Sequence, residues 1–266
     1  LWTDEMPPPR EVLLEKSSGI AGILCLLNDD IDSEFFEAAG PQLKVVSQIA
    51  VGFDNIDIPE ATSRGVPVGN TPEVLPQTTA DATWALLMAA ARRITEGERA
   101  VRDGRWRTWH PLHYLGHDVY GSTLGVVGLG RIGVEVAKRA QGFNMDVLYT
   151  DVARREDMEA ECSARFVDMD TLLRESDFIS LHTVLNDATY HLIDDDALDK
   201  MKSNAVLVNA ARGPVVDPAA LYRALKDGKI AGAGLDVTEP EPIGIDDPLL
   251  TLENCVIVPH IASASV

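Results

Sequence analysis

Cysteine is scarce in this sequence. Its 266 residues include only Cys25, Cys162 and Cys255, which are widely spaced and odd in number. None of them has the short spacing of a metal-ligand pair. Such cysteine usage is typical of reduced proteins rather than of disulfide-stabilised secreted ones. We therefore expect a cytoplasmic protein and predict no metal site.

Long apolar runs and basic residues are also in short supply. No apolar run approaches the roughly 20 residues that cross a bilayer, and nothing near residue 1 resembles a signal peptide. The chain has 23 Lys and Arg against 42 Asp and Glu, for a net charge of −19. This charge repels nucleic-acid backbones and anionic membranes. We expect neither nucleic acid nor membrane as a partner.

The remaining composition is that of an ordinary globular protein, with 45% apolar and 24% charged residues. A length of 266 residues is comfortable for two domains. Strand-like and helix-like segments alternate throughout, which predicts parallel sheets covered by helices. We predict a smaller domain over residues 1–93 and a dinucleotide-binding domain over 94–266, with the boundary inside one long helix at about 79–103. The six strands predicted for the second domain cover residues 123–128, 146–150, 178–182, 205–209, 233–237 and 256–259.

A glycine-rich motif, G-x-G-x-x-G, follows the first of these strands. It consists of Gly128, Leu129, Gly130, Arg131, Ile132 and Gly133. The preceding apolar strand and the following amphipathic helix are the context that a dinucleotide-binding loop requires. The glycines allow a tight turn, close approach of a pyrophosphate and close packing of helix on strand. The free N–H groups at the helix start would face the phosphates.

Asp151 ends the next strand, 23 residues after Gly128 (151 − 128). An acidic residue at about this distance binds the adenosine ribose hydroxyls and repels a 2′-phosphate. NAD(H) is therefore favoured as the cofactor. Arg154 and Arg155 follow closely, so NADP(H) stays possible if these side chains fold back. Their alternative role is that of a solvated turn.

Three chemically suited side chains follow late strands of the second domain. They are Arg212 in "NAARGPVVD", Glu241 in "DVTEPEP" and His260 in "VIVPHIASAS". A guanidinium binds a carboxylate, an imidazolium protonates a carbonyl oxygen, and a carboxylate beside that imidazole raises its pKa. Taken singly, they could be a turn residue, a solvated acid and a buried histidine. Their joint placement after strands of a dinucleotide-binding sheet favours catalysis.

These segments, with "LKVVSQIAVGFDNID", "GVPVGNTPEVLPQTTAD", "GVVGLGRIG" and "SDFISLHTVL", resemble the D-isomer-specific 2-hydroxyacid dehydrogenases, and most closely their glyoxylate/hydroxypyruvate reductases. The resemblance implies an α/β fold, with a Rossmann-type doubly wound parallel sheet and a smaller flavodoxin-like substrate domain. It implies NAD(P)H-dependent reduction of a small 2-keto acid to the 2-hydroxy acid. Arg212, Glu241 and His260 would then be catalytic, with His260 as the general acid. "TEPEP" offers two acids, and the family spacing of five residues after the Asp of "LDV" selects Glu241.

Further roles follow from the same resemblance. Val51 and Gly52 would receive the substrate carboxylate, together with Arg212. Residues 104–120 resemble a dimer arm in which Trp109 crosses into the partner's active site, so a homodimer is expected; packing at the interface is the alternative role of Trp109. Residues 129–132 would contact the pyrophosphate, and the other expected cofactor contacts are Thr183, Ala210, Arg212 and Asp236, with Asp236 reaching the nicotinamide amide.

The resemblance leaves alternatives open. The first strand of the substrate domain and the closing C-terminal helix of the family have no counterpart here, which raises the possibility of an inactive fragment. Phosphoglycerate, D-lactate and formate dehydrogenases share the fold. Residues 48–56 lack the extra basic residues that phosphoglycerate would require, and the Glu241–His260 pair argues against the formate type. From another class, NAD-sensing corepressors also share this fold.

Overall fold

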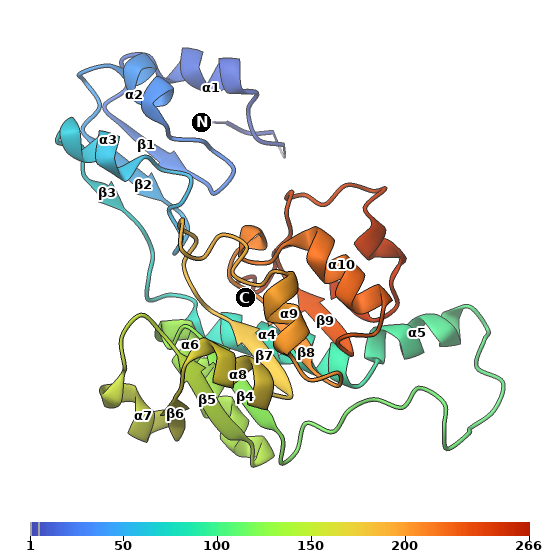
Figure 1. The fold of residues 1–266 in the computed structure, drawn as a ribbon. Coiled ribbons are helices and arrows are strands. Elements are labelled where there is room, and N and C mark those ends of the chain that lie inside the picture. Colours follow the sequence, from blue (N-terminus) through green and yellow to red (C-terminus); the bar gives the residue numbers. More distant parts are fainter. Residues whose placement is uncertain (1, 5) are drawn as a thin grey trace. The chain divides into compact units, whose positions relative to one another are not determined.

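A computed structural model describes residues 2–4 and 6–266 (Figure 1). The chain divides into two compact units, with the division between Val74 and Leu75. Each unit has its own hydrophobic core. The division lies 19 residues before the boundary predicted at 93/94. The difference arises because helix α4 (Pro76–Ala91) buries one face in the core of the second unit.

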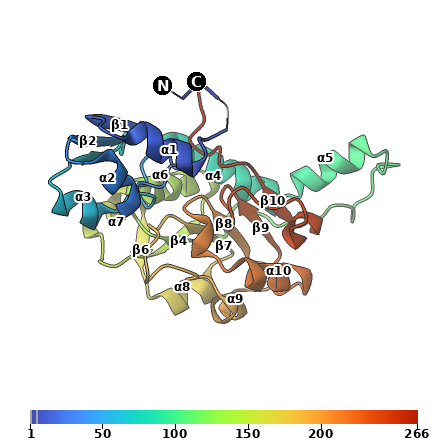
Figure 2. The ribbon, with the colours of Figure 1, turned by 90° about the horizontal axis from the view of Figure 1, so that it is seen from above.

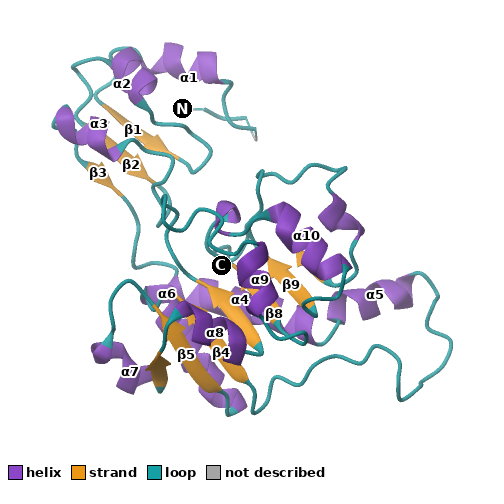
Figure 3. Ribbon diagram, viewed as in Figure 1, coloured by secondary structure: helices purple, strands orange, loops and turns teal. Residues whose placement is uncertain are grey.

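The first unit is a three-stranded parallel sheet in the order β1-β2-β3. Three helices pack on one face of it around Phe35, Phe36 and Val46, while Leu24 and Val45 on the other face are exposed (Figure 3). Helix α1 was not predicted, because it has no apolar stripe; Arg10 at its start is ion-paired with Asp32 and Glu34. The elements are α1 (Arg10–Ser17), β1 (Gly22–Cys25), α2 (Ser33–Ala39), β2 (Val45–Gln48), α3 (Ile58–Ser63) and β3 (Val68–Gly69).

The second unit is built on a seven-stranded parallel sheet in the order β10-β9-β8-β7-β4-β5-β6. This is the doubly wound arrangement, with the reversal of strand order between β4 and β7. Open sheets of this kind place ligands at the carboxyl ends of their strands, next to that reversal. The strands are β4 (Thr123–Val127), β5 (Asp146–Thr150), β6 (Ala164–Phe166), β7 (Phe178–Leu181), β8 (Val206–Asn209), β9 (Gly232–Leu235) and β10 (Cys255–Ile257).

Helices cover both faces of this sheet (Figure 2). One core holds α4 and α6 against the strands through Trp84, Leu87 and Val136. The other holds α8, α9 and α10 through Leu172, Leu198 and Leu221. The remaining helices of the unit are α5 (Ile94–Arg102), α6 (Arg131–Ala140), α7 (Glu156–Cys162), α8 (Met169–Glu175), α9 (Asp195–Lys200) and α10 (Pro218–Lys226), with short 3-10 helices at Gln141–Phe143, Gly213–Val215 and Pro248–Thr251.

Two predictions of secondary structure were wrong. The sheet has seven strands after residue 123, not six, because the edge strand β6 and helix α7 were missed. β6 has only three residues, and two of them are exposed, so no apolar pattern marks it. The long helix predicted over 79–103 is broken at Arg92–Arg93. Arg93 adopts a left-handed conformation (φ 52°) and makes a bidentate ion pair with the buried Glu96.

Candidate active site

The glycine motif connects β4 to α6 at the reversal of strand order, as predicted. Gly128 has φ 92°, and a Cβ there would lie 2.7 Å from the carbonyl oxygen of His182. A Cβ on Gly133 would lie 2.1 Å from the carbonyl oxygen of Gly128. Only glycine fits either position. By contrast, nothing lies within 4 Å of a Cβ on Gly130, and no side chain caps the start of α6. The loop thus leaves room for a phosphate group at a helix N-terminus.

Asp151 lies directly beside this loop. One carboxylate oxygen accepts the N–H of Leu129 at 2.8 Å and the other accepts the N–H of Val152 at 2.7 Å. Asp151 therefore fixes the loop and presents a negative charge at the end of β5, where the adenosine ribose of a dinucleotide binds. Thr183 is also close to the loop, since a Cβ on Gly128 would lie 3.1 Å from its nitrogen. Ala210 follows β8 and is largely buried.

Arg154 and Arg155 are both engaged by neighbouring acids. Arg154 donates to both oxygens of Glu159, at 2.7 and 2.9 Å. Arg155 donates to Asp157 and, at 3.2 Å, to the carbonyl oxygen of Leu129 in the glycine loop. Arg155 thus lies at the cofactor loop, whereas Arg154 belongs to the turn before α7.

The residues predicted to be catalytic come together after β8, β9 and β10. Nδ1 of His260 lies 2.5 Å from Oε1 of Glu241, and the two side chains are 30% and 39% exposed. The hydrogen bond and negative charge of Glu241 raise the pKa of His260 against the opposing effect of burial. Burial alone would raise the pKa of Glu241, but His260 and the positive charge of Arg212 hold it below its ordinary value.

Arg212 lies in a turn fixed by Asn209, the last residue of β8. The side-chain amide of Asn209 donates to the carbonyl oxygen of Arg212 at 2.8 Å and accepts the N–H of Ala211 at 3.0 Å. Arg212 itself donates to the carbonyl oxygen of Ala211. Asn209 was not singled out from the sequence, although its place at a strand end before a turn is typical of such a residue.

Asp236 holds the loop that carries His260. Its carboxylate is buried and accepts the N–H groups of Ile261 and Ala262, the former at 2.7 Å. Its carbonyl oxygen accepts the N–H of His260 at 2.9 Å. His260 has φ 51°, an uncommon conformation for a side-chain-bearing residue, which such contacts must maintain. The contact of Asp236 with a nicotinamide amide stays a prediction.

Val51 and Gly52 belong to the first unit, in the loop after β2. The carbonyl oxygens of four successive residues, 50–53, are all bonded within the unit. They accept the N–H of Thr71, the side-chain amides of Asn70 (2.8 Å) and Gln48 (3.3 Å), and the N–H of Ile56. Because its carbonyl groups are engaged in these bonds, the loop is fixed. Its binding of a carboxylate stays a prediction.

Gln48 connects this loop to a buried polar network. It is 2% exposed, accepts the thiol of Cys25 at 2.9 Å and donates to Asn55 at 2.8 Å. Asn55 in turn donates to the carbonyl oxygens of Leu26 and Asp29. A hydrogen-bond network of this kind, anchored on the buried side chains of Gln48 and Cys25, is rigid. Neither Gln48 nor Asn70 was singled out from the sequence.

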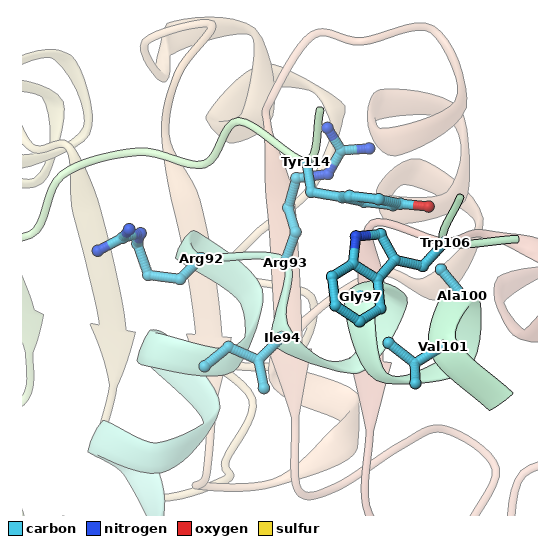
Figure 4. Close-up of a pocket in the computed structure, with 8 residues that line it drawn as sticks. All are labelled: Arg92, Arg93, Ile94, Gly97, Ala100, Val101, Trp106 and Tyr114. Carbon is cyan, nitrogen blue, oxygen red and sulfur yellow. The ribbon is translucent and has the colours of Figure 1, made fainter. Parts of the chain in front are cut away.

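The segment 104–120 forms no helix or strand and follows α5 in the second unit (Figure 1). Trp109 is 78% exposed. Trp106 lines an open pocket of about 310 Å³ at α5, where Tyr114 and Arg93 lie beside it (Figure 4). Other apolar side chains of α5 and this segment are also exposed: Ile94, Val101, Leu112 and Leu115.

Residues 84–262 match the family model of the D-isomer-specific 2-hydroxyacid dehydrogenase NAD-binding domain. Over its whole length the chain is 58% identical to a glyoxylate reductase from Korarchaeum cryptofilum, covering 80% of that protein. The crystal structure of the TT0316 protein from Thermus thermophilus has a TM-score of 0.91 at 45% identity, covering 98% of this chain and 81% of that one. The crystal structure of a glyoxylate reductase from Paecilomyes thermophila has a TM-score of 0.87 at 36% identity, covering 96% of this chain and 80% of that one. The chain belongs to the D-isomer-specific 2-hydroxyacid dehydrogenases, oxidoreductases with an NAD-binding domain.

Proposed function

We propose that the chain reduces glyoxylate and hydroxypyruvate to their 2-hydroxy acids, with His260 as the general acid. The observation that carries this proposal is the His260–Glu241 pair beside Arg212, at the strand ends of an NAD-binding sheet. The names of its relatives support the choice of substrate.

The mechanism assigns one task to each side chain. The nicotinamide cofactor, when bound, supplies a hydride to C2 of the keto acid. The protonated imidazole of His260 donates its Nε2 proton to the carbonyl oxygen, while Glu241 stabilises the charge through Nδ1. Arg212 binds the substrate carboxylate and polarises the carbonyl group. For Val51 and Gly52, in the first unit, binding of a substrate carboxylate stays a prediction.

The residues proposed to bind the cofactor are the glycine loop, residues 128–133, and Asp151, Thr183 and Ala210. The open space at Gly130 and the uncapped start of α6 fit a pyrophosphate. Because the Asp151 carboxylate repels a 2′-phosphate, we propose NADH as the preferred donor. Arg155 supports NADPH as the second cofactor, since it already contacts the loop.

The test is the initial rate of NADH and NADPH oxidation with glyoxylate, hydroxypyruvate and pyruvate. Rapid turnover of the first two substrates supports the proposal, and faster turnover of pyruvate points instead to a D-lactate dehydrogenase. Cofactor binding without any turnover contradicts the enzyme and favours a corepressor-like sensor.

The exposed apolar side chains of α5 and residues 104–120 support a homodimer formed through the NAD-binding unit, because such patches mark protein interfaces. Light scattering on the chain should give twice the monomer mass. Leu112→Asp should shift it towards the monomer, while Met6→Asp, an exposed control in the first unit, should not.

The three cysteines are buried and unpaired, which supports a reducing compartment, the cytoplasm. No helix in the described residues is long and apolar enough to cross a membrane.

A further inference from the structure

The second unit contains another histidine–glutamate pair, His191 with Glu239, that the proposed reaction does not use. Nε2 of His191 lies 2.7 Å from Oε2 of Glu239, and the two side chains are 29% and 28% exposed. The hydroxyl of Tyr190 donates to the other oxygen of Glu239, and its ring stacks on that of His191 with 4.0 Å between centroids. Glu239 is the acid of "TEPEP" that the family spacing left without a role.

The backbone of His191 is bound to the turn that follows Arg212. Its N–H donates to the carbonyl oxygen of Pro214 at 2.7 Å, and the N–H of Ile193 donates to that of Val215 at 3.0 Å. His191 has φ 48°, an uncommon conformation that surrounding contacts must hold.

The same turn packs against the residues that precede Glu241. A Cβ on Gly213 would lie 1.8 Å from the carbonyl oxygen of Thr238 and 2.9 Å from the nitrogen of Glu239, so the two segments are in direct contact. The hydroxyl of Thr238 donates to the carbonyl oxygen of Pro240 at 2.8 Å. His191 is thus bonded to the Arg212 turn through its backbone and to the Glu241 loop through its side chain.

We propose that His191 and Glu239 are positioning residues that lock the loop carrying Glu241 against the turn carrying Arg212. The inference rests on the proposed function and deepens it. Neither side chain contacts the reacting atoms in the proposed mechanism. Their effect is to keep the carboxylate of Glu241 at His260 while the guanidinium of Arg212 holds the substrate.

Steady-state kinetics of Glu239→Ala, His191→Ala, the double variant and Glu239→Gln test the pair. A misplacement of about 1 Å in an active site costs up to about 100-fold in rate, so Glu239→Ala should lower kcat by about 10- to 100-fold. KM for the keto acid should change by less than about twofold, because the residues that bind it are untouched. Glu239→Gln keeps an acceptor for His191 and should recover most of the rate. The double variant His191→Ala/Glu239→Ala should lose no more of kcat than Glu239→Ala alone. If the losses of kcat in the two single variants add up in the double variant, the pair is not coupled.

A proton NMR titration of His260 gives a readout that does not depend on turnover. Glu241, Asp236 and Arg212 are the charged groups that influence its imidazole. If Glu239→Ala displaces Glu241, the pKa of His260 should fall towards its ordinary value of about 6.5. The matched control is Glu175→Gln, which breaks the exposed Arg165–Glu175 pair and should leave the titration unchanged. An unchanged pKa in Glu239→Ala would overturn the inference, even if the variant is slow.

His260→Ala, measured in parallel, separates the two proposals. If that variant loses turnover while Glu239→Ala keeps both rate and titration, only the positioning role fails. If His260→Ala retains turnover, the proposed function fails, and the titration alone still decides whether Glu239 holds Glu241.

Discussion

His260 and Glu241 form a hydrogen bond of 2.5 Å through Nδ1 of the imidazole, although 19 residues separate them in the chain. A carboxylate at Nδ1 fixes the orientation and tautomer of the ring, so Nε2 is the nitrogen that would act as the acid. The same contact raises the pKa of His260, so that the imidazole keeps a proton for the reduction at higher pH.

Replacing His260 by Ala removes the proposed proton donor. We expect kcat for keto-acid reduction to fall by about 10²- to 10⁴-fold, the range for loss of general acid catalysis. The dissociation constant for NADH, measured by fluorescence titration, should hold within about threefold. Arg174→Ala, on the exposed surface of α8, is the control and should keep full turnover. Equal losses in turnover and cofactor affinity would argue against the acid role.

Glu241→Gln should move the pH dependence of reduction. The pKa of His260 is raised by Glu241, and reduction needs the protonated ring, so activity is present below this pKa and is lost as pH rises through it. Without the carboxylate the pKa falls, and the alkaline loss of kcat/KM should occur at lower pH. The profile should be measured from about pH 5 to 9. A profile identical to that of the wild type would mean that Glu241 does not set the pKa.

Asp151→Ala should weaken the proposed preference for NADH. Its carboxylate lies at the end of β5 and repels a 2′-phosphate. We expect the ratio of kcat/KM for NADH over NADPH to fall by about tenfold, equivalent to one charge interaction of about 1.4 kcal/mol. Asp199→Asn, which breaks the surface pair with Lys229, is the control. A ratio that does not change rules out Asp151 as the discriminating residue.

Asn70→Ala should raise KM for the keto acid. Its amide donates to the carbonyl oxygen of Val51 and helps to fix the loop that is predicted to receive the carboxylate. The loss of one hydrogen bond is worth about 0.5–1.5 kcal/mol, so KM should increase about 2- to 10-fold. We expect kcat within about twofold of the wild type, because the acid is unaffected. The exposed Asn28→Ala is a matched control, and a fall in kcat with constant KM would contradict the assignment.

Trp84→Ala should destabilise the second unit. Its ring stacks on Phe143 at 4.8 Å, and Nε1 donates to the carbonyl oxygen of Val136, which joins α4 to α6. Truncating a buried tryptophan costs about 3–5 kcal/mol. Urea unfolding followed by circular dichroism should show this loss, while Trp2→Ala, at a more exposed position, should show little. A small loss in Trp84→Ala would mean that α4 contributes little to this core.

Much of the fold was predictable because parallel strands are marked by apolar runs and the glycine motif has a fixed context. The ends of the predicted strands then indicated Arg212, Glu241 and His260 as candidate catalytic residues. What escaped prediction depends on contacts distant in sequence. β6 is defined by its pairing with β5, not by its own residues. The helix break at Arg93 depends on an ion pair inside a segment of good helix formers.

The supporting residues of the site escaped for a related reason. Asn70 and Gln48 act on a loop through side-chain amides, and polar residues near turns are too common to mark such a role. Glu239 was visible as a second acid, but its partner His191 lies 48 residues earlier. Only the folded chain brings them together.

The order of the strands separates two functions across the sheet. The loop and carboxylate that would select the cofactor follow β4 and β5, whereas the acid, its carboxylate partner and the guanidinium follow β8, β9 and β10. A substitution in the cofactor loops therefore replaces none of the residues that would carry the chemistry. During evolution the enzyme could therefore change its preference between NADH and NADPH through substitutions around α7, without an intermediate form that lacks its catalytic residues.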